Sequence, residues 1–178
     1  MAWGGWSLDE HCPGGILSLD QRPSYFHERF KKVYEIPYRC LYSKNVPNLM
    51  FAGRNVSVSH MALSSTRIIG TCCMMGQAVG VATAMCIEKN INPREIYLSY
   101  IDELQERMLR NDYYIPNRPA NDSNDLTRTV DKVWATSTSS GDVHNLFDGV
   151  ARDEENKIHH WQSDGLLSLI HISEPTRL

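Results

Sequence analysis

Residues 48–80 read NLMFAGRNVSVSHMALSSTRIIGTCCMMGQAVG, and this stretch decides the fold. Its short apolar run, 49–52, stops at Gly53 and predicts a buried strand. From Arg67 to Lys89 nearly every residue is apolar or small, which predicts a long helix that is buried on all sides. The hydroxyl cluster 64–66 supplies N-cap candidates for that helix. The stretch therefore predicts strand, loop and buried helix, which is a unit of an α/β fold.

The segments beside this unit predict further elements. Alternation of apolar residues over 33–41, interrupted by Pro37, indicates a short edge strand. Asn92 followed by Pro93 indicates a helix start, and the segment that follows, down to Asn111, predicts an amphipathic surface helix.

Composition limits the function classes. The 178 residues carry a formal net charge of −3, which argues against a nucleic-acid partner. No apolar run approaches the ~18 residues that span a bilayer, so we expect no membrane span. The five cysteines include no CxxC pair, and we expect buried thiols rather than metal ligands or disulfides.

Composition also shifts along the chain. We expect a first domain over 1–116, a polar linker over 117–128 and an incomplete β-sandwich over 129–166. The segment 167–177 reads LSLIHISEPTR and matches, residue for residue, one reading frame of a transposase-type sequencing adapter. We therefore expect 167–178 to be a non-native tail and base no prediction of the fold on it.

The strand–loop–helix unit suits an anionic ligand. Gly53 lets a ligand approach the backbone, and a helix N-terminus attracts negative charge through its free N–H groups. The same pattern also occurs where a buried helix lies beside a strand and binds nothing, and the residues alone leave both interpretations open.

Several motifs together carry a family resemblance. They are residues 6–11 (WSLDEH), 36–39 (IPYR), 48–54 (NLMFAGR), 76–80 (GQAVG) and 112–116 (DYYIP). Together they resemble a bacterial family of FAD-dependent oxidoreductases with two dinucleotide-binding domains. The resemblance implies that the chain is the C-terminal portion of an FAD-binding Rossmann-like domain, with FAD as its cofactor.

The resemblance also implies which residues lie near FAD. Gly53 and Arg54 would lie by the ribityl chain or the pyrophosphate, and Ser65, Thr66 and Arg67 at a helix N-terminus by the flavin ring. Many relatives carry an acidic residue where Arg54 stands, to hold a ribityl hydroxyl. Arginine at this position indicates a phosphate or substrate contact instead.

Two histidines are candidate catalytic bases. His60 follows the glycine in a polar loop, and His11 ends the 6–11 motif. Either imidazole is suited to accept the proton of a substrate hydroxyl during alcohol oxidation. The alternative for each is a hydrogen-bonded loop histidine.

The resemblance implies transfer of a hydride from a C–H bond of a hydroxylated substrate to flavin N5. Residues 129–164 resemble the opening of a discoidin-like β-sandwich, a module attached to carbohydrate-active proteins, which suggests a carbohydrate substrate. No GxGxxG motif occurs, so we expect a fragment truncated at both ends that binds FAD weakly and is inactive alone. Two alternatives remain: a non-catalytic carbohydrate-binding surface protein with an α/β scaffold, and reductase or isomerase chemistry on the same flavin domain.

Overall fold

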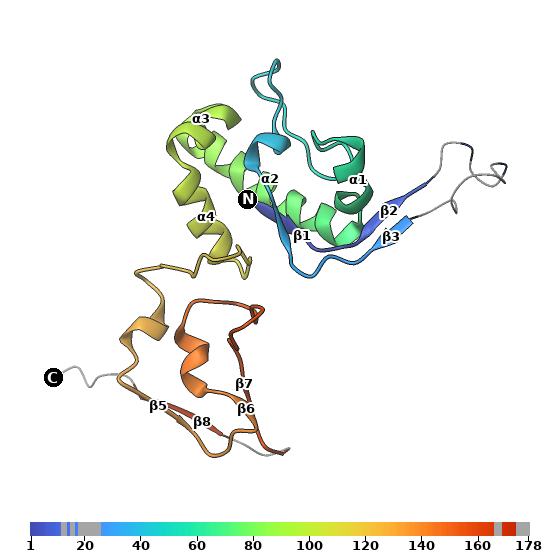
Figure 1. The fold of residues 1–178 in the computed structure, drawn as a ribbon. Coiled ribbons are helices and arrows are strands. Elements are labelled where there is room, and N and C mark those ends of the chain that lie inside the picture. Colours follow the sequence, from blue (N-terminus) through green and yellow to red (C-terminus); the bar gives the residue numbers. More distant parts are fainter. Residues whose placement is uncertain (12–13, 15–16, 18–25, 166–168, 174–178) are drawn as a thin grey trace. The chain divides into compact units, whose positions relative to one another are not determined.

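The computed structural model describes residues 1–11, 14, 17, 26–165 and 169–173 (Figure 1). These residues form a mixed α/β structure with four α-helices and four two-stranded antiparallel sheets. The chain divides into two compact units, an N-terminal unit, Met1–Gln105, and a C-terminal unit, Glu106–Leu178. The α/β class predicted from the sequence is confirmed. The predicted boundaries at 116, 128 and 166 stay predictions.

The N-terminal unit begins with a β-ribbon made of two short antiparallel strand pairs. β1 (Ala2–Gly4) pairs with β4 (Tyr34–Ile36), and β2 (Leu8–Glu10) pairs with β3 (Phe26–Glu28). Gly4 lies opposite Tyr34, and a Cβ at position 4 would stand 2.6 Å from the Tyr34 hydroxyl oxygen. The absence of a side chain at Gly4 therefore makes room for the Tyr34 hydroxyl.

The predicted strand over 33–41 is shorter than expected. β4 ends at Ile36, and a 3-10 helix, η2 (Tyr38–Leu41), follows Pro37. Proline has no N–H to donate to a ladder, so pairing with β1 stops there.

The predicted buried strand over 49–52 is wrong. Within the described residues this run finds no partner strand, and an isolated bridge between Met50 and Tyr42 is its one β contact. Leu49 is 42% exposed. The apolar run is therefore an extended loop segment that leads to Gly53.

Four helices follow this loop. They are α1 (His60–Thr66), α2 (Ile69–Lys89), α3 (Pro93–Ser99) and α4 (Ile101–Leu109). Asn90 ends α2 with a left-handed backbone, φ 52°, and Pro93 begins α3 directly after Asn92. The predicted helix start at Pro93 is confirmed, although a break at Tyr100 divides the predicted single helix in two.

The hydroxyl cluster 64–66 lies inside α1 and does not cap α2. Ser59 caps α1 instead, because its Oγ accepts the Ala62 N–H. α2 begins after Ile68, whose side chain makes no capping hydrogen bond. The predicted N-cap role of the cluster is therefore wrong, and the reason is that an additional short helix precedes the long one.

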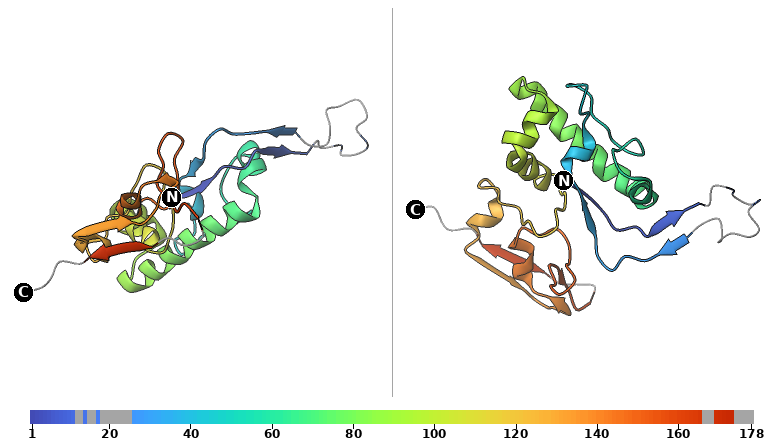
Figure 2. Two further views of the ribbon diagram at one scale, coloured as in Figure 1. Left: turned by 90° about the horizontal axis from the view of Figure 1, so that it is seen from below. Right: turned by 45° about the horizontal axis from the view of Figure 1, so that its top comes forward.

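α2 runs alongside β1 and buries one face (Figure 2). The buried residues recur at helical spacing: Thr71, Met75, Ala78, Ala82 and Met85. Ile69 and Ile87 are 81% and 76% exposed, and a Cβ at Gly76 or Gly80 would meet no atom within 4 Å. The prediction of a helix buried on all sides is wrong, because β1 and α3 cover a single stripe.

The composition of α2 also bears on the expected absence of a membrane span. By length and composition this helix is able to cross a membrane, and 28% of its most apolar window is buried. The expectation that no segment reaches this length is therefore wrong for α2. Core helices of globular proteins pass the same test.

The C-terminal unit contains short elements. They are η3 (Leu126–Thr129), β5 (Lys132–Ala135), β6 (Ser140–Gly141), η4 (Val143–Phe147), β7 (Trp161–Gln162) and β8 (Ile170–Ser173). β5 pairs with β8 and β6 pairs with β7. β8 falls within the predicted tail, whereas residues 167, 168 and 174–178 of that tail lie outside the described residues. The non-native origin of 167–178 stays a prediction.

Candidate functional site

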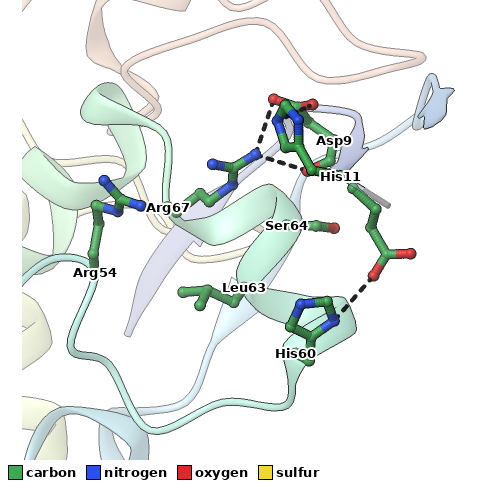
Figure 3. Close-up of a pocket in the computed structure, with 8 residues that line it drawn as sticks. Asp9, His11, Arg54, His60, Leu63, Ser64 and Arg67 are labelled. Carbon is green, nitrogen blue, oxygen red and sulfur yellow. Dashed lines mark hydrogen bonds and ion pairs between the residues drawn. The ribbon is translucent and has the colours of Figure 1, made fainter. Parts of the chain in front are cut away.

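A cleft of about 250 Å³ in the N-terminal unit gathers four of the seven predicted site residues (Figure 3). The lining residues are Asp9, Glu10, His11, Arg54, His60, Leu63, Ser64 and Arg67. We call this the histidine cleft. The predicted residues Gly53, Ser65 and Thr66 do not line it.

Arg67 joins the end of α1 to β2. Its Nη2 donates to the Asp9 carbonyl oxygen at 2.8 Å and lies 3.2 Å from Asp9 Oδ2. The two side chains are 23% and 28% exposed, so solvent screens this pair less than a fully exposed one. A ligand anion at Arg67 would therefore compete with Asp9.

Each histidine lies beside a carboxylate. His60 Nδ1 is 3.5 Å from Glu10 Oε1, and His11 Nε2 is 3.4 Å from Asp9 Oδ1. At these distances each carboxylate attracts the imidazole in its protonated form. The imidazoles are 87% and 59% exposed, so both are open to solutes.

Sequence reasoning missed Asp9 and Glu10. Both precede His11 directly in the 6–11 motif, which was the available signal. Their role depends on α1 packing beside β2, since this contact brings His60 and Arg67 to them.

Arg54 is exposed and lies near the first turn of α2. Burial is the largest cause that raises the pKa of the Cys72 thiol, and the neighbouring Cys73 raises it further. The positive charge of Arg54 lowers this pKa. The first N–H groups of a helix have no intrahelical partner, and here a Cβ at Gly70 would meet nothing within 4 Å. Arg54 and the start of α2 together form an accessible, positively polarised region.

Gly53 has a backbone φ of +110°, a conformation that L side chains rarely adopt. A Cβ there would meet only Asn55 Oδ1, at 3.9 Å. Glycine is therefore required for the backbone turn, and the backbone at this point is open to close approach.

Ser65 and Thr66 are the last residues of α1 and Arg67 is its C-cap, so the predicted place of all three at a helix N-terminus is wrong. Ser65 Oγ donates to the Trp6 carbonyl oxygen at 2.5 Å, so in the 2.6 Å contact between Tyr34 and Ser65 it is the Tyr34 hydroxyl that donates. Thr66 Oγ1 donates to the Ala62 carbonyl oxygen at 3.0 Å. Both hydroxyl protons serve the fold, and the cofactor role of these residues stays a prediction.

Metal ligation has no candidate in the described part of the chain. No group of three or more His, Cys, Asp or Glu side chains there is placed to hold an ion. Four cysteines are free thiols: Cys40, Cys72, Cys73 and Cys86. Cys73 is exposed and the other three are partly buried, so the predicted burial of these thiols is wrong. Cys12 lies outside the described residues.

Comparison with protein families identifies the N-terminal unit. The model of a family described as FAD dependent oxidoreductase matches residues 1–108, which include the whole histidine cleft. Neither the comparison with curated proteins nor the comparison with solved structures gives a match. Because the family match covers more than half of the 178 residues, the chain belongs to the FAD dependent oxidoreductase family and its cofactor is FAD.

Proposed function

We propose that the histidine cleft is the substrate side of an oxidoreductase that removes a hydride from a C–H bond of a hydroxylated substrate, carbohydrates included. When bound, FAD supplies the hydride acceptor at flavin N5. The observation that supports the proposal is the convergence of His11, His60 and Arg54 from three separate segments on one cleft.

The described residues fit the anionic part of FAD. Arg54, the open backbone at Gly53 and the start of α2 offer a guanidinium and main-chain N–H groups, which are the donors that bind phosphate. The histidine cleft, at about 250 Å³, is smaller than the roughly 300–1,000 Å³ of sites that enclose drug-sized ligands, so it accommodates only part of FAD. We propose Gly53 and Arg54 as FAD contacts, within the C-terminal portion of a Rossmann-like domain.

His60 and His11 are the proposed proton acceptors. Loss of a hydride from a carbon that bears a hydroxyl yields a carbonyl only when a base takes the hydroxyl proton. One ring nitrogen of His60 lies 3.5 Å from Glu10, and one of His11 lies 3.4 Å from Asp9. The exposure of both rings leaves them within reach of a substrate hydroxyl.

The test is anaerobic reduction, by simple sugars and alcohols, of the FAD-loaded full-length protein that contains this chain, because we expect the 178-residue chain alone to be inactive. Reduction is followed through the loss of flavin absorbance. His60→Gln or His11→Gln is expected to slow reduction about 10²-fold, the usual contribution of a general base. His160→Gln, in the C-terminal unit, is the matched control. Reduction at the unchanged rate in both cleft variants would exclude the proposed bases.

Arg54 is tested separately by equilibrium dialysis with FAD. Arg54→Glu is expected to weaken FAD binding about tenfold, which corresponds to about 1.4 kcal/mol. Lys44→Glu, which alters another exposed cation of the same unit, is the control. Equal FAD binding by the two variants would remove Arg54 from the site.

A second candidate function is carbohydrate binding by the C-terminal unit. Trp134 is 51% exposed and lines a cleft of about 410 Å³ together with Asp131, Lys132 and His144. An aromatic ring beside polar side chains is a suitable platform for a sugar. Calorimetric titration with oligosaccharides, on the chain and on Trp134→Ala, tests this function without any flavin.

A further inference from the structure

The C-terminal unit brings a serine, a histidine and an aspartate into one hydrogen-bonded line. Ser140 Oγ lies 3.2 Å from His160 Nε2, and His160 Nδ1 lies 2.7 Å from Asp153 Oδ2. The three residues come from β6, from the position directly before β7 and from the loop between η4 and β7. A serine at one ring nitrogen and a carboxylate at the other is the arrangement that activates a hydroxyl as a nucleophile. We call these residues the serine triad.

Pairing of β6 with β7 places the serine beside the histidine. Gly141 follows Ser140 with a backbone φ of +70°, and a Cβ there would collide with the His160 carbonyl oxygen. The same carbonyl oxygen accepts the Asp142 N–H at 3.3 Å and the Asn145 amide at 3.0 Å. Glycine is therefore required for this close approach, and two donors hold the backbone of His160 in place.

The hydrogen bonds of Asp153 set the direction of the serine proton. The His159 N–H donates to Asp153 Oδ1 at 2.7 Å, and this bond is the largest cause that lowers the pKa of Asp153. The carboxylate is therefore ionised at neutral pH and only accepts hydrogen bonds. His160 Nδ1 must then carry a proton, so in the neutral ring Nε2 is the acceptor and the Ser140 hydroxyl donates to it.

A second histidine–aspartate pair lies next to the serine triad and is buried. His159 Nδ1 lies 2.5 Å from Asp148 Oδ2, and the His159 side chain is 1% exposed. Its Nε2 has no hydrogen-bond partner among the described residues. The side chains of His160 and Asp153 are instead 41% and 45% exposed. A dissolved substrate therefore reaches His160 and does not reach His159.

The surroundings of Ser140 favour an uncharged substrate with a short apolar group. Ile158 is 48% exposed, and its Cγ2 would lie 3.3 Å from a Cβ at Gly141, the residue after Ser140. The carboxylates of Asp142 and Asp153 disfavour an anion near the serine. A short neutral acyl group meets both conditions.

We propose that the serine triad hydrolyses carboxylic esters that carry a short neutral acyl group. Ser140 Oγ bonds to the ester carbonyl carbon, and its proton passes to His160 Nε2. The bond from that carbon to the alcohol oxygen breaks, and the alcohol leaves with the proton. Water then attacks the acyl carbon and gives a proton to His160, and the bond to Ser140 Oγ breaks as this proton returns to the serine. The products are one carboxylic acid and one alcohol.

Labelling of the flavin-free 178-residue chain with an alkyl fluorophosphonate tests the nucleophile. Ser140 Oγ displaces fluoride from phosphorus and loses its proton to His160, and peptide mass spectrometry locates the phosphonate ester. We expect a label at Ser140 and none in Ser140→Ala. Ser139→Ala is the matched control and should leave labelling unchanged, because Ser139 Oγ donates to the carbonyl oxygens of residues 162 and 163. Labels spread over several serines, or none on Ser140, would overturn the proposal.

Turnover is measured with p-nitrophenyl acetate, and acid-quenched samples are analysed for an acetyl group on Ser140. His160→Gln is expected to slow both labelling and acetylation about 10²-fold, the usual contribution of a general base. Ser140→Ala should reduce hydrolysis to the rate that exposed imidazoles give alone. Equal hydrolysis by the unaltered chain and Ser140→Ala would contradict the proposal, and circular dichroism verifies the fold of each variant.

Asp153 is a positioning residue, because it acts through His160. Asp153→Asn is expected to lower the maximal rate of labelling and to leave the probe concentration at half-maximal rate unchanged, and Asp153→Glu to restore part of the rate. An unchanged maximal rate in Asp153→Asn would contradict the triad. None of these measurements uses FAD, and the sugars and alcohols of the flavin test contain no ester, so failure of this proposal and failure of the oxidoreductase proposal are distinguishable.

Discussion

The histidine cleft and a second cleft beside α1, which we call the apolar cleft, use one short helix in opposite ways. The apolar cleft has a volume of about 760 Å³, and its lining includes Leu8, Phe30, Val33 and Met61. α1 contributes His60, Leu63 and Ser64 to the first cleft, and Met61, Ala62 and the Ser65–Thr66 pair to the second. Positions three and four apart share a helix face, so seven residues separate into two sets. The two clefts also differ in the residues that face α1. Asp9 and Glu10 line the histidine cleft, and residues 30–34 line the apolar cleft.

This comparison shows that the chemical character of each cleft is set by the residues packed around α1 rather than by α1 itself. Serines face both clefts, but in the apolar cleft Ser65 is 2% exposed and its hydroxyl is fully engaged between Tyr34 and Trp6. The carboxylates of the histidine cleft are instead about a quarter exposed and pair with side chains that a ligand is able to displace.

Among the residues of α1 that separate the two clefts, we expect substitution of Ser65 to lower the stability of the fold most. Ser65→Ala deprives the Tyr34 hydroxyl of its acceptor and should lower the free energy of unfolding by about 2–3 kcal/mol. Ser64→Ala is the control, because Ser64 Oγ donates only to Met61 within the same helix at 2.7 Å, and we expect a loss of about 0.5 kcal/mol. Urea denaturation measures both, and equal losses would refute the distinction between the two faces.

Arg67→Ala tests the attachment of α1 to β2 on the histidine side. Loss of the contacts to Asp9 is expected to lower the free energy of unfolding by about 1 kcal/mol, because the pair is only partly shielded from solvent. The effect should shrink at high salt. Arg54→Ala, which removes an exposed cation of the same cleft, is expected to leave stability within about 0.5 kcal/mol; a larger loss would mean that Arg54 also holds the fold.

α2 provides a third surface for comparison with the two clefts, because none of the described residues of its unit covers it at Gly76. Gly76→Ala is expected to raise the free energy of unfolding by about 0.5–1 kcal/mol, through helix propensity alone. Thermal and urea unfolding measure the change. A decrease would show that another surface packs against this position.

The smallest expected effect is the pH dependence of the apolar cleft. Burial raises the pKa of Tyr34 above its ordinary value of 10.0, against the opposing hydrogen bond with Ser65. The unfolded chain therefore loses this proton first, and stability should fall as the pH rises above 10. Tyr34→Phe should make this fall less steep. Urea denaturation between about pH 9 and 11 compares the two, and identical slopes would show that Tyr34 does not contribute.

Local signals in the sequence predicted part of this fold. Asn92 followed by Pro93 marks a helix start because the start of a helix depends on the few residues around it, and α3 begins at Pro93 as expected. The strand over 49–52 and the full burial of α2 were predicted wrongly, because both depend on partners distant in sequence. An apolar residue indicates a preference for burial and does not identify what will cover it.

The candidate site was predictable to a similar extent. Motif resemblance led to His11, His60, Arg54 and Arg67, which one cleft brings together. The partners Asp9 and Glu10, and the inward direction of Ser65, follow from the packing of α1 on β2. The apolar cleft had no sequence signal, since residues 30–32 lie in a stretch without sustained periodicity.

Gly4 has a consequence for sequence variation among relatives. The 2.6 Å approach of the Tyr34 hydroxyl oxygen to the place of its missing Cβ makes the two positions interdependent. A side chain at position 4 is compatible with this ribbon only when the residue at position 34 lacks the hydroxyl or its ring adopts another rotamer. We therefore expect positions 4 and 34 to covary, with glycine retained wherever tyrosine is retained.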